Sequence, residues 1–418
     1  MCRALRWDRP VCPLIARRLT SLGMTAATTA ALNECIDRIR AAAHERMPLR
    51  LRGGGSKDFY GDAHEYARGA GPQAQVLDTR ILRGISSYEP SELVITALAG
   101  TPLTELEAAL AEHGQCLPFE PPHFDLNHNG ISTATVGGMV AAGLSGPARA
   151  TVGAVRDYVL GAKVINGRGQ LLTFGGQVMK NVAGYDVSRL LVGSLGTLGL
   201  ITEVSLKVLP IAPAQATLRF ALDEAQALER CNRWAGQPLP LNASAWLVEE
   251  GQATLYLRLR GAAAAVQAAQ ARLLAELPGQ AMDADASAAF WQQARDLRLP
   301  WFAQGLAQGQ DLWRLSVPGV SAPLGVGDTL IDWLGAQRWV WAAPGDAQAA
   351  QRLRSAAQAV GGHASLFVPA LVSKPSEAIP RSGRFAALAP QVLAVHQRLK
   401  AEFDPAGIFN PGRLHAAL

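Results

Sequence analysis

Hydrophobic and polar positions in the first quarter of the chain alternate between helical and strand-like spacing. Between residues 25 and 44, leucine and isoleucine recur every three or four positions, which predicts one amphipathic helix. Short apolar runs predict strands at 49–52, 75–78 and 91–100. A helix is expected over 101–114, because Thr-Pro opens this segment and glycine ends it.

Apolar runs continue beyond residue 150, with turn residues between them. Two runs over 157–176 flank Asn166-Gly167, which predicts a hairpin. Alternation over 198–210 predicts a strand that ends at proline, and the Pro/Ala stretch 209–217 reads as a linker.

A mixed strand and helix pattern then appears twice, over 216–277 and 312–367. The repetition predicts an antiparallel sheet with helices on one face. Tryptophans at 246, 313, 339 and 341 fall on the predicted strands, and those at 339 and 341 share one face, which favours core over a binding platform. A last helix is expected over 390–403, followed by the tail FDPAGIFNPGRL.

Composition and charge limit the classes of function. The chain has 418 residues, of which 49% are hydrophobic and 17% charged, so two or three domains with sizeable cores are expected. The formal charge is +5, yet no Lys/Arg block with interleaved aromatics occurs. An acidic partner or an anionic small substrate therefore fits better than a nucleic acid.

Five cysteines occur without any C-x-x-C pair. This spacing argues against an iron–sulfur cluster, a zinc or other metal site, or a disulfide scaffold, and predicts a reducing compartment. No apolar run approaches about 18 residues, so no membrane span is expected. Residues 1–23 are basic without a long apolar core, which argues against a signal peptide, and Met24 reads as an alternative start.

Three glycine-dense segments raise the question of a ligand. The first, RGGGSK at 52–57, lacks the spacing of a P-loop or of the Rossmann fingerprint, and taken alone it also fits a tight turn. Segments 132–153 and 193–202 are similarly small and rich in glycine. Small residues let backbone amides approach an anion closely. Together the segments suit one extended ligand with a central diphosphate and a planar ring at each end.

The order of these motifs resembles the FAD-binding domain of the vanillyl-alcohol-oxidase and p-cresol-methylhydroxylase (PCMH) flavoproteins. The likeness covers roughly residues 27–210 and rests on RGGGSK, TATVGG, AGLSG and GSLGTLGLIT. The tail resembles that of the subgroup that oxidises 2-hydroxy acids. Within that subgroup the chain most resembles the FAD-binding subunits of bacterial glycolate oxidases, through MKNVAGYDVSRLLVGSLGTLG, RWVWAAPGDA, AVGGHASLF and the tail.

The resemblance implies an α+β fold in four parts. An N-terminal extension (1–24) precedes a two-subdomain PCMH-type FAD-binding domain (25–210). A ferredoxin-like antiparallel α+β cap (211–389) follows, which would meet substrate or dock another subunit. The helix and tail at 390–418 are expected to return to the FAD domain.

FAD held without a covalent bond is the cofactor that the resemblance implies. Some relatives attach flavin through a histidine in the first loop, but Ser56 stands in that slot and His64 reads as a loop residue. Lys57 fits either a phosphate contact or a solvated loop lysine. The residues expected to bind FAD are Arg52, Gly53, Gly54, Gly55, Ser56, Lys57, Thr135, Gly137, Gly138, Ala142, Gly143, Ser145, Gly196, Thr197, Leu198, Gly199, Leu200, Ile201 and Thr202.

Hydroxy-acid oxidation requires a cation for the carboxylate and a base for the hydroxyl proton. Related dehydrogenases carry a His-x-Gly-Asp-Gly-Asn motif, whose nearest counterpart here, GGHASLF, lacks the acidic and amide residues. His363 therefore also fits a structural histidine, and an exposed polar loop also explains the two arginines named below. The weak catalytic candidates are Lys180, Tyr185, His363, Arg381 and Arg384.

The leading hypothesis is an FAD-binding subunit of a glycolate dehydrogenase complex, which oxidises glycolate to glyoxylate and passes electrons onward. Its partners would be a second flavoprotein and an iron–sulfur subunit. The expected location is cytoplasmic, with peripheral association to the inner membrane through those partners. Two alternatives stay open: a stand-alone D-2-hydroxy-acid dehydrogenase of the D-lactate type, and a non-catalytic interaction subunit that contains FAD.

Overall fold

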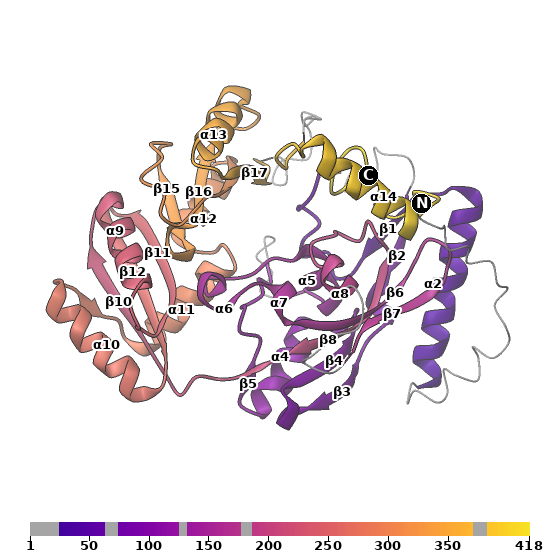
Figure 1. Ribbon diagram of the computed structural model, residues 1–418, viewed down its shortest axis with the longest axis horizontal. Coiled ribbons are helices and arrows are strands. Elements are labelled where there is room, and N and C mark those ends of the chain that lie inside the picture. Colours follow the sequence, from indigo (N-terminus) through magenta and orange to yellow (C-terminus); the bar gives the residue numbers. More distant parts are fainter. Residues whose placement is uncertain (1–24, 63–73, 125–131, 177–185, 371–382) are drawn as a thin grey trace, which may run out of the picture.

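The chain folds into two mixed helix and sheet parts that lie side by side, with the C-terminal helix lying back over the first part (Figure 1). The computed structural model describes residues 25–62, 74–124, 132–176, 186–370 and 383–418. This architecture confirms the predicted α+β class with a ferredoxin-like second part.

The first part is built on a five-stranded antiparallel sheet in the order β3-β4-β8-β6-β7. One face of this sheet packs on α4, α5 and α7 around a core that includes Ile95, Leu106 and Val204. The strands are β3 (Ile85–Glu89), β4 (Val94–Leu98), β6 (Val159–Ile165), β7 (Leu171–Gly175) and β8 (Leu200–Lys207), and the helices are α4 (Leu103–Glu112), α5 (Val136–Ala142), α6 (Arg149–Val152), α7 (Val155–Tyr158) and α8 (Val187–Leu190).

A parallel pair of strands, β1 (Leu49–Arg52) and β2 (Gln75–Asp78), forms a second small sheet in the first part. The helix α2 (Ala26–Glu45) packs its apolar stripe against this pair, and the Thr25 side chain caps its first turn. The 3-10 turns η2 (Thr79–Ile81) and η3 (Pro90–Glu92) follow β2 and β3. Residues 53–58 form the loop that follows β1, whose position is fixed by β2 and α2.

The second part is a single eight-stranded antiparallel sheet in the order β13-β10-β12-β11-β15-β16-β14-β17. Each half has the strand order 4-1-3-2 of a ferredoxin-like unit, and the halves join edge to edge through β11 and β15. The strands are β10 (Ala214–Ala221), β11 (Leu241–Glu249), β12 (Gln252–Gly261), β13 (Gln280–Ala281), β14 (Asp311–Ser316), β15 (Thr329–Asp332), β16 (Gln337–Ala342) and β17 (His363–Val368), and the helical segments are α9 (Glu224–Ala235), α10 (Ala263–Glu276), α11 (Ala284–Arg295), α12 (Pro300–Ala307), η4 (Trp333–Gly335) and α13 (Ala347–Ala359).

Helices cover both faces of this sheet, so the expectation of one covered face is wrong. On β16, Trp339 packs among α11 and α12 side chains, whereas Val340 packs against α13. Successive strand residues point to opposite faces. The residues on both faces are apolar here, so each face is buried under helices.

Two local predictions also differ from the structure. The segment expected as a linker pairs within sheets: β9 (Leu209–Pro210) with β5 (Gln115–Cys116), and Ala214–Thr217 as the start of β10. In the hairpin between β6 and β7, the positive φ (+67°) lies at Gly169 rather than at Gly167. Asn166 instead bonds to Gln170 and closes a longer loop.

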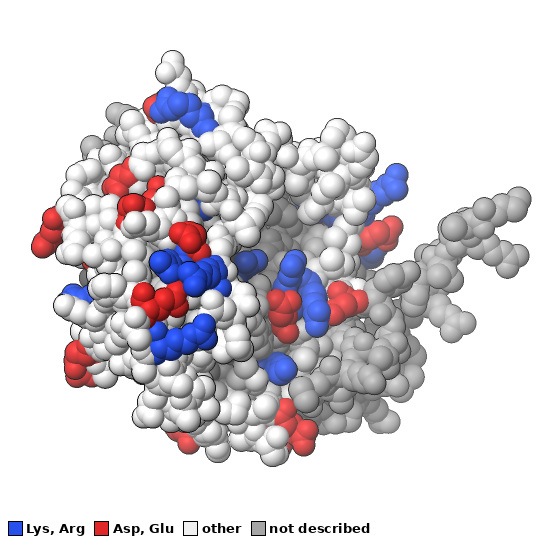
Figure 2. Space-filling view, turned by 60° about the vertical axis from the view of Figure 1, so that its left-hand side comes forward, with Lys and Arg blue, Asp and Glu red and all other residues white. Residues whose placement is uncertain are grey.

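The C-terminal helix α14 (Pro390–Phe403) and its tail pack on the first part. Phe409 forms an isolated parallel bridge with Leu49, which extends the small sheet by one strand position. Among the helices that the structure describes, none has the length and apolar character needed to cross a bilayer. Basic and acidic side chains are interspersed on the face of the molecule that brings the second part forward (Figure 2).

Candidate functional site

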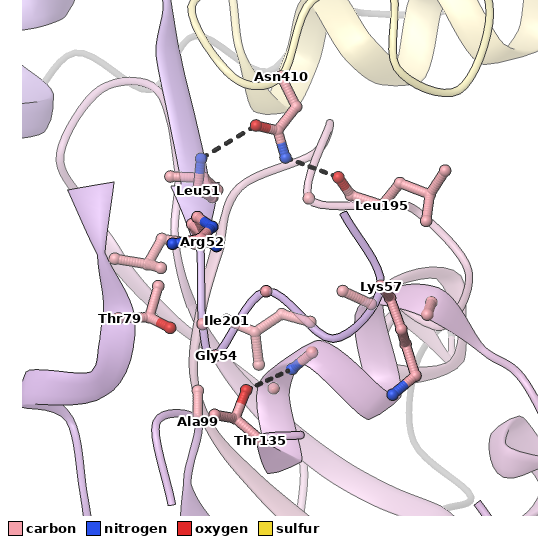
Figure 3. A pocket seen from close by; sticks show the side chains of 18 of the residues that line it. Leu51, Arg52, Gly54, Lys57, Thr79, Ala99, Thr135, Leu195, Ile201 and Asn410 are labelled. Atoms are coloured by element: carbon pink, nitrogen blue, oxygen red, sulfur yellow. Dashed lines mark hydrogen bonds between the residues drawn. The ribbon is translucent and has the colours of Figure 1, made fainter. Parts of the chain in front are cut away.

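A cleft of about 670 Å³, counted to its open mouth, runs through the first part where four segments meet. They are the glycine loop after β1, the start of α5, the segment before β8, and the tail after α14 (Figure 3). The three glycine-dense segments expected to act together therefore do border one space.

Close backbone packing explains the first two glycines of the loop. A Cβ on Gly54 would lie 1.5 Å from the Thr133 carbonyl oxygen, and a Cβ on Gly53 would lie 2.4 Å from the Thr135 hydroxyl. Such distances are far inside van der Waals contact. The glycine loop therefore lies directly against the second segment, and no larger residue fits there.

The glycine loop also supplies backbone donors. Among the described residues, no protein acceptor receives the N–H groups of Gly54, Gly55, Ser56 and Lys57. Successive unpaired amides in a turn form a positive concavity that suits an anion. The donors that this segment offers are therefore main-chain groups, as the sequence predicted for the loop.

The start of α5 differs in this respect. Gly137 N–H donates to the Ala99 carbonyl at 2.7 Å, and Gly138 N–H donates to the Thr135 hydroxyl at 3.3 Å. A Cβ on Gly137 would also lie 2.6 Å from the Ala99 side chain. These glycines line the cleft and keep it open, but their amides bond within the protein.

Lys57 is 7% exposed and lines the inner end of the cleft. Its Nζ lies 3.3 Å from the Ser56 hydroxyl and 5.6 Å from the centre of the Phe124 ring. Burial lowers the pKa of this ammonium to about 8, against the opposing attraction of Asp296. Lys57 is therefore not a solvated loop lysine. Besides Asp296, a bound anion next to Nζ would stabilise its charge.

Basic side chains gather around Asp58 on the same loop. Arg50 and Arg52 lie 2.7 and 2.6 Å from its carboxylate, and the Arg413 guanidinium donates to the Lys57 carbonyl at 3.2 Å. Burial lowers the pKa of Arg413, and the charges of Arg50 and Arg52 lower it further, against the attraction of Asp58. One carboxylate among these guanidinium groups leaves the site positive.

Asn410 ties the tail to both walls of the cleft. Its Oδ1 accepts from Leu51 N–H at 3.0 Å, and its Nδ2 donates to the Leu195 carbonyl at 2.7 Å (Figure 3). The side chain is 3% exposed, so both bonds form away from water. The tail therefore fixes the distance between the glycine loop and the segment before β8.

Most of the residues expected to bind FAD line this cleft. Those that do are Arg52, Gly53, Gly54, Gly55, Ser56, Lys57, Thr135, Gly137, Gly138, Ala142, Gly196, Gly199, Leu200 and Ile201. The expected residues outside its lining are Gly143, Ser145, Thr197, Leu198 and Thr202. Of these, Gly143 ends α5 in a left-handed conformation, and Thr197 and Thr202 bond to neighbouring carbonyls.

Sequence reasoning missed other residues of the lining. They are Leu51, Asp58, Thr79, Ala99, Ala141, Leu195, Asn410 and Arg413. Asn410 and Arg413 stand in the quoted tail motif NPGR, which was taken for a family signature rather than for part of the site. The apolar ones carry no signal that separates them from core residues.

Neither of the two catalytic candidates that the structure describes, His363 and Arg384, lines this cleft. Lys180, Tyr185 and Arg381, like His64, lie outside the described residues. His363 stands at the start of β17, where partial desolvation of its ring, followed by the charge of Arg314, lowers its pKa. Arg384 is 4% exposed and donates to the Phe59 carbonyl, so it is not an exposed loop residue.

Comparisons with known proteins match this picture. The FAD binding domain family matches residues 26–175, and the C-terminal domain of FAD linked oxidases matches residues 386–414. Glycolate oxidase subunit GlcE of Escherichia coli is 41% identical over 394 residues, covering 93% of this chain and 100% of that one.

More distant relatives match shorter stretches of the chain. D-lactate dehydrogenase of Archaeoglobus fulgidus is 33% identical over 41% of this chain and 35% of its own. Glycolate oxidase subunit GlcD of Bacillus subtilis is 32% identical over 34% and 29%. A solved alkyldihydroxyacetonephosphate synthase shares the fold, with a TM-score of 0.62 at 15% identity over 90% of this chain and 73% of that one.

Proposed function

The chain belongs to the GlcE family of glycolate oxidase subunits, and from that membership we propose that the cleft in its first part holds FAD through residues of the glycine loop and the tail. FAD is the cofactor of its FAD-binding domain, and FAD-dependent oxidation of a 2-hydroxy acid is the activity to which the chain contributes.

The four unpaired amides of the glycine loop carry this assignment. They lie beside Lys57 and the positive site around Asp58, and FAD contains a diphosphate that needs donors and cations of this kind. Small residues at 137, 138, 196 and 199 leave room for the rest of an extended dinucleotide. Ser56 offers no imidazole, so we propose that the cofactor is held without a covalent bond.

Bound FAD supplies the hydride acceptor that hydroxy-acid oxidation requires. The residues of this chain bind the cofactor and pair its phosphates with cations such as Lys57. The tail, held by Asn410, packs over the cleft and excludes water. Leu195 and Ala142 belong to the apolar cluster that also contains Phe59 and Phe124.

We place the chain in a complex with other subunits of a glycolate oxidase. A GlcD-type flavoprotein and an iron–sulfur subunit are the partners in this proposal, because the chain itself has no C-x-x-C pair for a cluster. Association with a membrane then runs through those partners. Glycolate is oxidised to glyoxylate, and the electrons pass to the partner subunits.

Purification of the chain alone and with its partners tests the proposal. The chain alone is expected to be yellow, to release one FAD on acid precipitation, and to be reduced by glycolate at full rate only beside its partners. Full anaerobic reduction by D-lactate in the isolated chain would support a stand-alone dehydrogenase instead. Flavin that stays oxidised with every hydroxy acid, partners included, would leave only an interaction subunit.

A further inference from the structure

A second, smaller cavity lies where the two parts of the molecule meet. Counted to its open mouth, it measures about 330 Å³, half the volume of the cleft. The first part contributes residues near 122–124 and 144–147, and the second part contributes the end of α11 and strands β14 to β17. Its lining includes Phe124, Arg295, Arg314, Asp332, Gln337 and Trp339.

Two polar atoms of this lining are buried without a partner in the described part of the chain. They are Arg314 Nε and Gln337 Oε1. Arg314 also donates from its terminal nitrogen to the Tyr60 hydroxyl at 3.2 Å, and its guanidinium lies 4.9 Å from the centre of the Phe367 ring. Buried polar groups are rarely left unpaired without a functional reason. A guanidinium held this way is prepared for a carboxylate.

Asp332 lies in the same cavity. Gln337 donates to its two oxygens at 2.9 and 3.0 Å, and Trp339 donates at 3.3 Å. Burial raises the pKa of this carboxyl to about 7, although these donors and the charge of Arg314 oppose the rise. A group that gains and loses its proton near neutral pH suits proton transfer.

The cavity adjoins the inner end of the cleft. Phe124 lines the cavity, and its ring lies 5.6 Å from Nζ of Lys57, which lines the cleft. Ala142, the last residue of α5, and Leu144, two residues further on, lie in the same apolar cluster but line different spaces, Ala142 the cleft and Leu144 the cavity. A small molecule in the cavity is thus a neighbour of a ligand in the cleft.

We propose that this cavity binds a small 2-hydroxy acid, with Arg314 pairing the substrate carboxylate and Asp332 accepting the hydroxyl proton. The inference rests on the proposed function, because it places the substrate beside the cleft assigned to FAD. It gives this chain a cation and a base of its own in place of the histidine motif that its sequence lacks. His363, which pairs with Ser316 between β17 and β14, then has no catalytic role.

The step balances without a further reactant. The hydroxyl proton passes to the Asp332 carboxylate as the C–O bond becomes C=O. The hydrogen on the α-carbon leaves with its electron pair to the flavin. The products are the 2-oxo acid, the protonated carboxyl and the two-electron-reduced cofactor.

Binding of oxalate to the FAD-containing chain tests the site without turnover. Isothermal titration is expected to show one site, at least tenfold weaker in Arg314→Gln. Arg298→Gln is the matched control, because Arg298 comes from the same region and does not line the cavity. Equal affinity in wild type and Arg314→Gln would overturn the assignment of Arg314.

The pH dependence of oxalate binding tests Asp332. The charges that face this carboxyl are Arg314 and Arg149, and Arg295 is paired with Asp296. Oxalate should bind more tightly as the pH falls through about 7, because the ionised carboxylate repels it. In Asp332→Asn this dependence should vanish while binding persists, and reduction of flavin by glycolate should slow by about 100-fold or more.

The outcomes separate the two proposals. Asp332→Asn with an unchanged pH profile, or with glycolate reduction at the wild-type rate, would refute the role of Asp332. Yellow protein that never binds oxalate would overturn this inference and leave the FAD assignment standing. Folded protein without FAD would overturn the proposed function itself.

Discussion

At the scale of single residues, Lys57 is the most informative group of the cleft. Its ammonium is buried, its hydrogen-bond partner among the described residues is the Ser56 hydroxyl, and burial lowers its pKa to about 8. A lysine in this state binds anions strongly, because a phosphate replaces the hydration that burial removed. The sequence left open whether Lys57 was solvated, since exposure depends on Phe124 and on charges that lie far away in the chain.

Loss of the Lys57 charge should weaken FAD binding. Apoprotein should bind FAD with constant affinity below about pH 8 and more weakly above it, since the ammonium loses its proton there. Lys57→Met should bind about tenfold more weakly and lack this pH dependence. Quenching of flavin fluorescence measures both. Lys207→Met is the control, because Lys207 lies outside the cleft lining; a matching loss in both variants would refute the role of Lys57.

Gly54 should tolerate no side chain. In Gly54→Ala the added Cβ meets the Thr133 carbonyl, so the loop must shift, with a stability loss of about 1–3 kcal/mol and low flavin content. Thermal unfolding and the flavin spectrum report these effects. Gly236→Ala, whose Cβ would lie 3.7 Å from its nearest neighbour, should leave both unchanged. Full flavin content in Gly54→Ala would contradict the close packing.

At the scale of elements, α14 and its tail complete the cleft from the far end of the chain. Lys400 Nζ donates to the Thr197 and Phe409 carbonyls and to Asp404, all at 2.7–2.8 Å and buried. Asp404 in turn accepts from the backbone of Ile408 and Phe409. This network orients the tail so that Asn410 meets both walls.

Breaking this network should undock the tail. Lys400→Met leaves the Asp404 carboxylate buried without its cation, which is expected to lower the free energy of unfolding by about 3–5 kcal/mol and to weaken FAD binding. Urea unfolding of the apoprotein measures the loss. Arg83→Met removes an exposed pair with Glu105 and should cost less than about 1 kcal/mol. Similar losses in both variants would show that the tail is not held this way.

Local sequence patterns predicted most helices and strands, but they did not predict contacts that depend on residues far away in the chain. The strands at 49–52 and 75–78 have the bounds that the sequence predicted, and Trp339 is core as expected. Gly137 looked like an anion donor, but its amide is taken by Ala99, which no local pattern shows. Arg384 looked exposed because its loop is polar, yet Phe59 and Asp62 of the first part bury it.

At the scale of the whole molecule, the two parts meet through a buried ion pair and an apolar cluster. Arg258 of β12 lies 2.6 Å from Glu120 of the first part and stacks on Trp291. The duplicated ferredoxin-like pattern was visible in the sequence, since each half repeats its strands. The junction was not, because its residues come from separate segments and share no motif. The cavity with Arg314 and Asp332 lies at this junction, so the sequence did not reveal it.

If glycine-loop amides and buried cations hold FAD in the first part, each folded chain carries one flavin. The most direct measurement is the flavin stoichiometry of the folded, purified chain, read from its visible spectrum and from FAD released by acid. One FAD per chain, all of it released, with loss in Gly54→Ala but not in Gly236→Ala, is the predicted result. A well-folded chain that stays colourless when FAD is added in excess would contradict it.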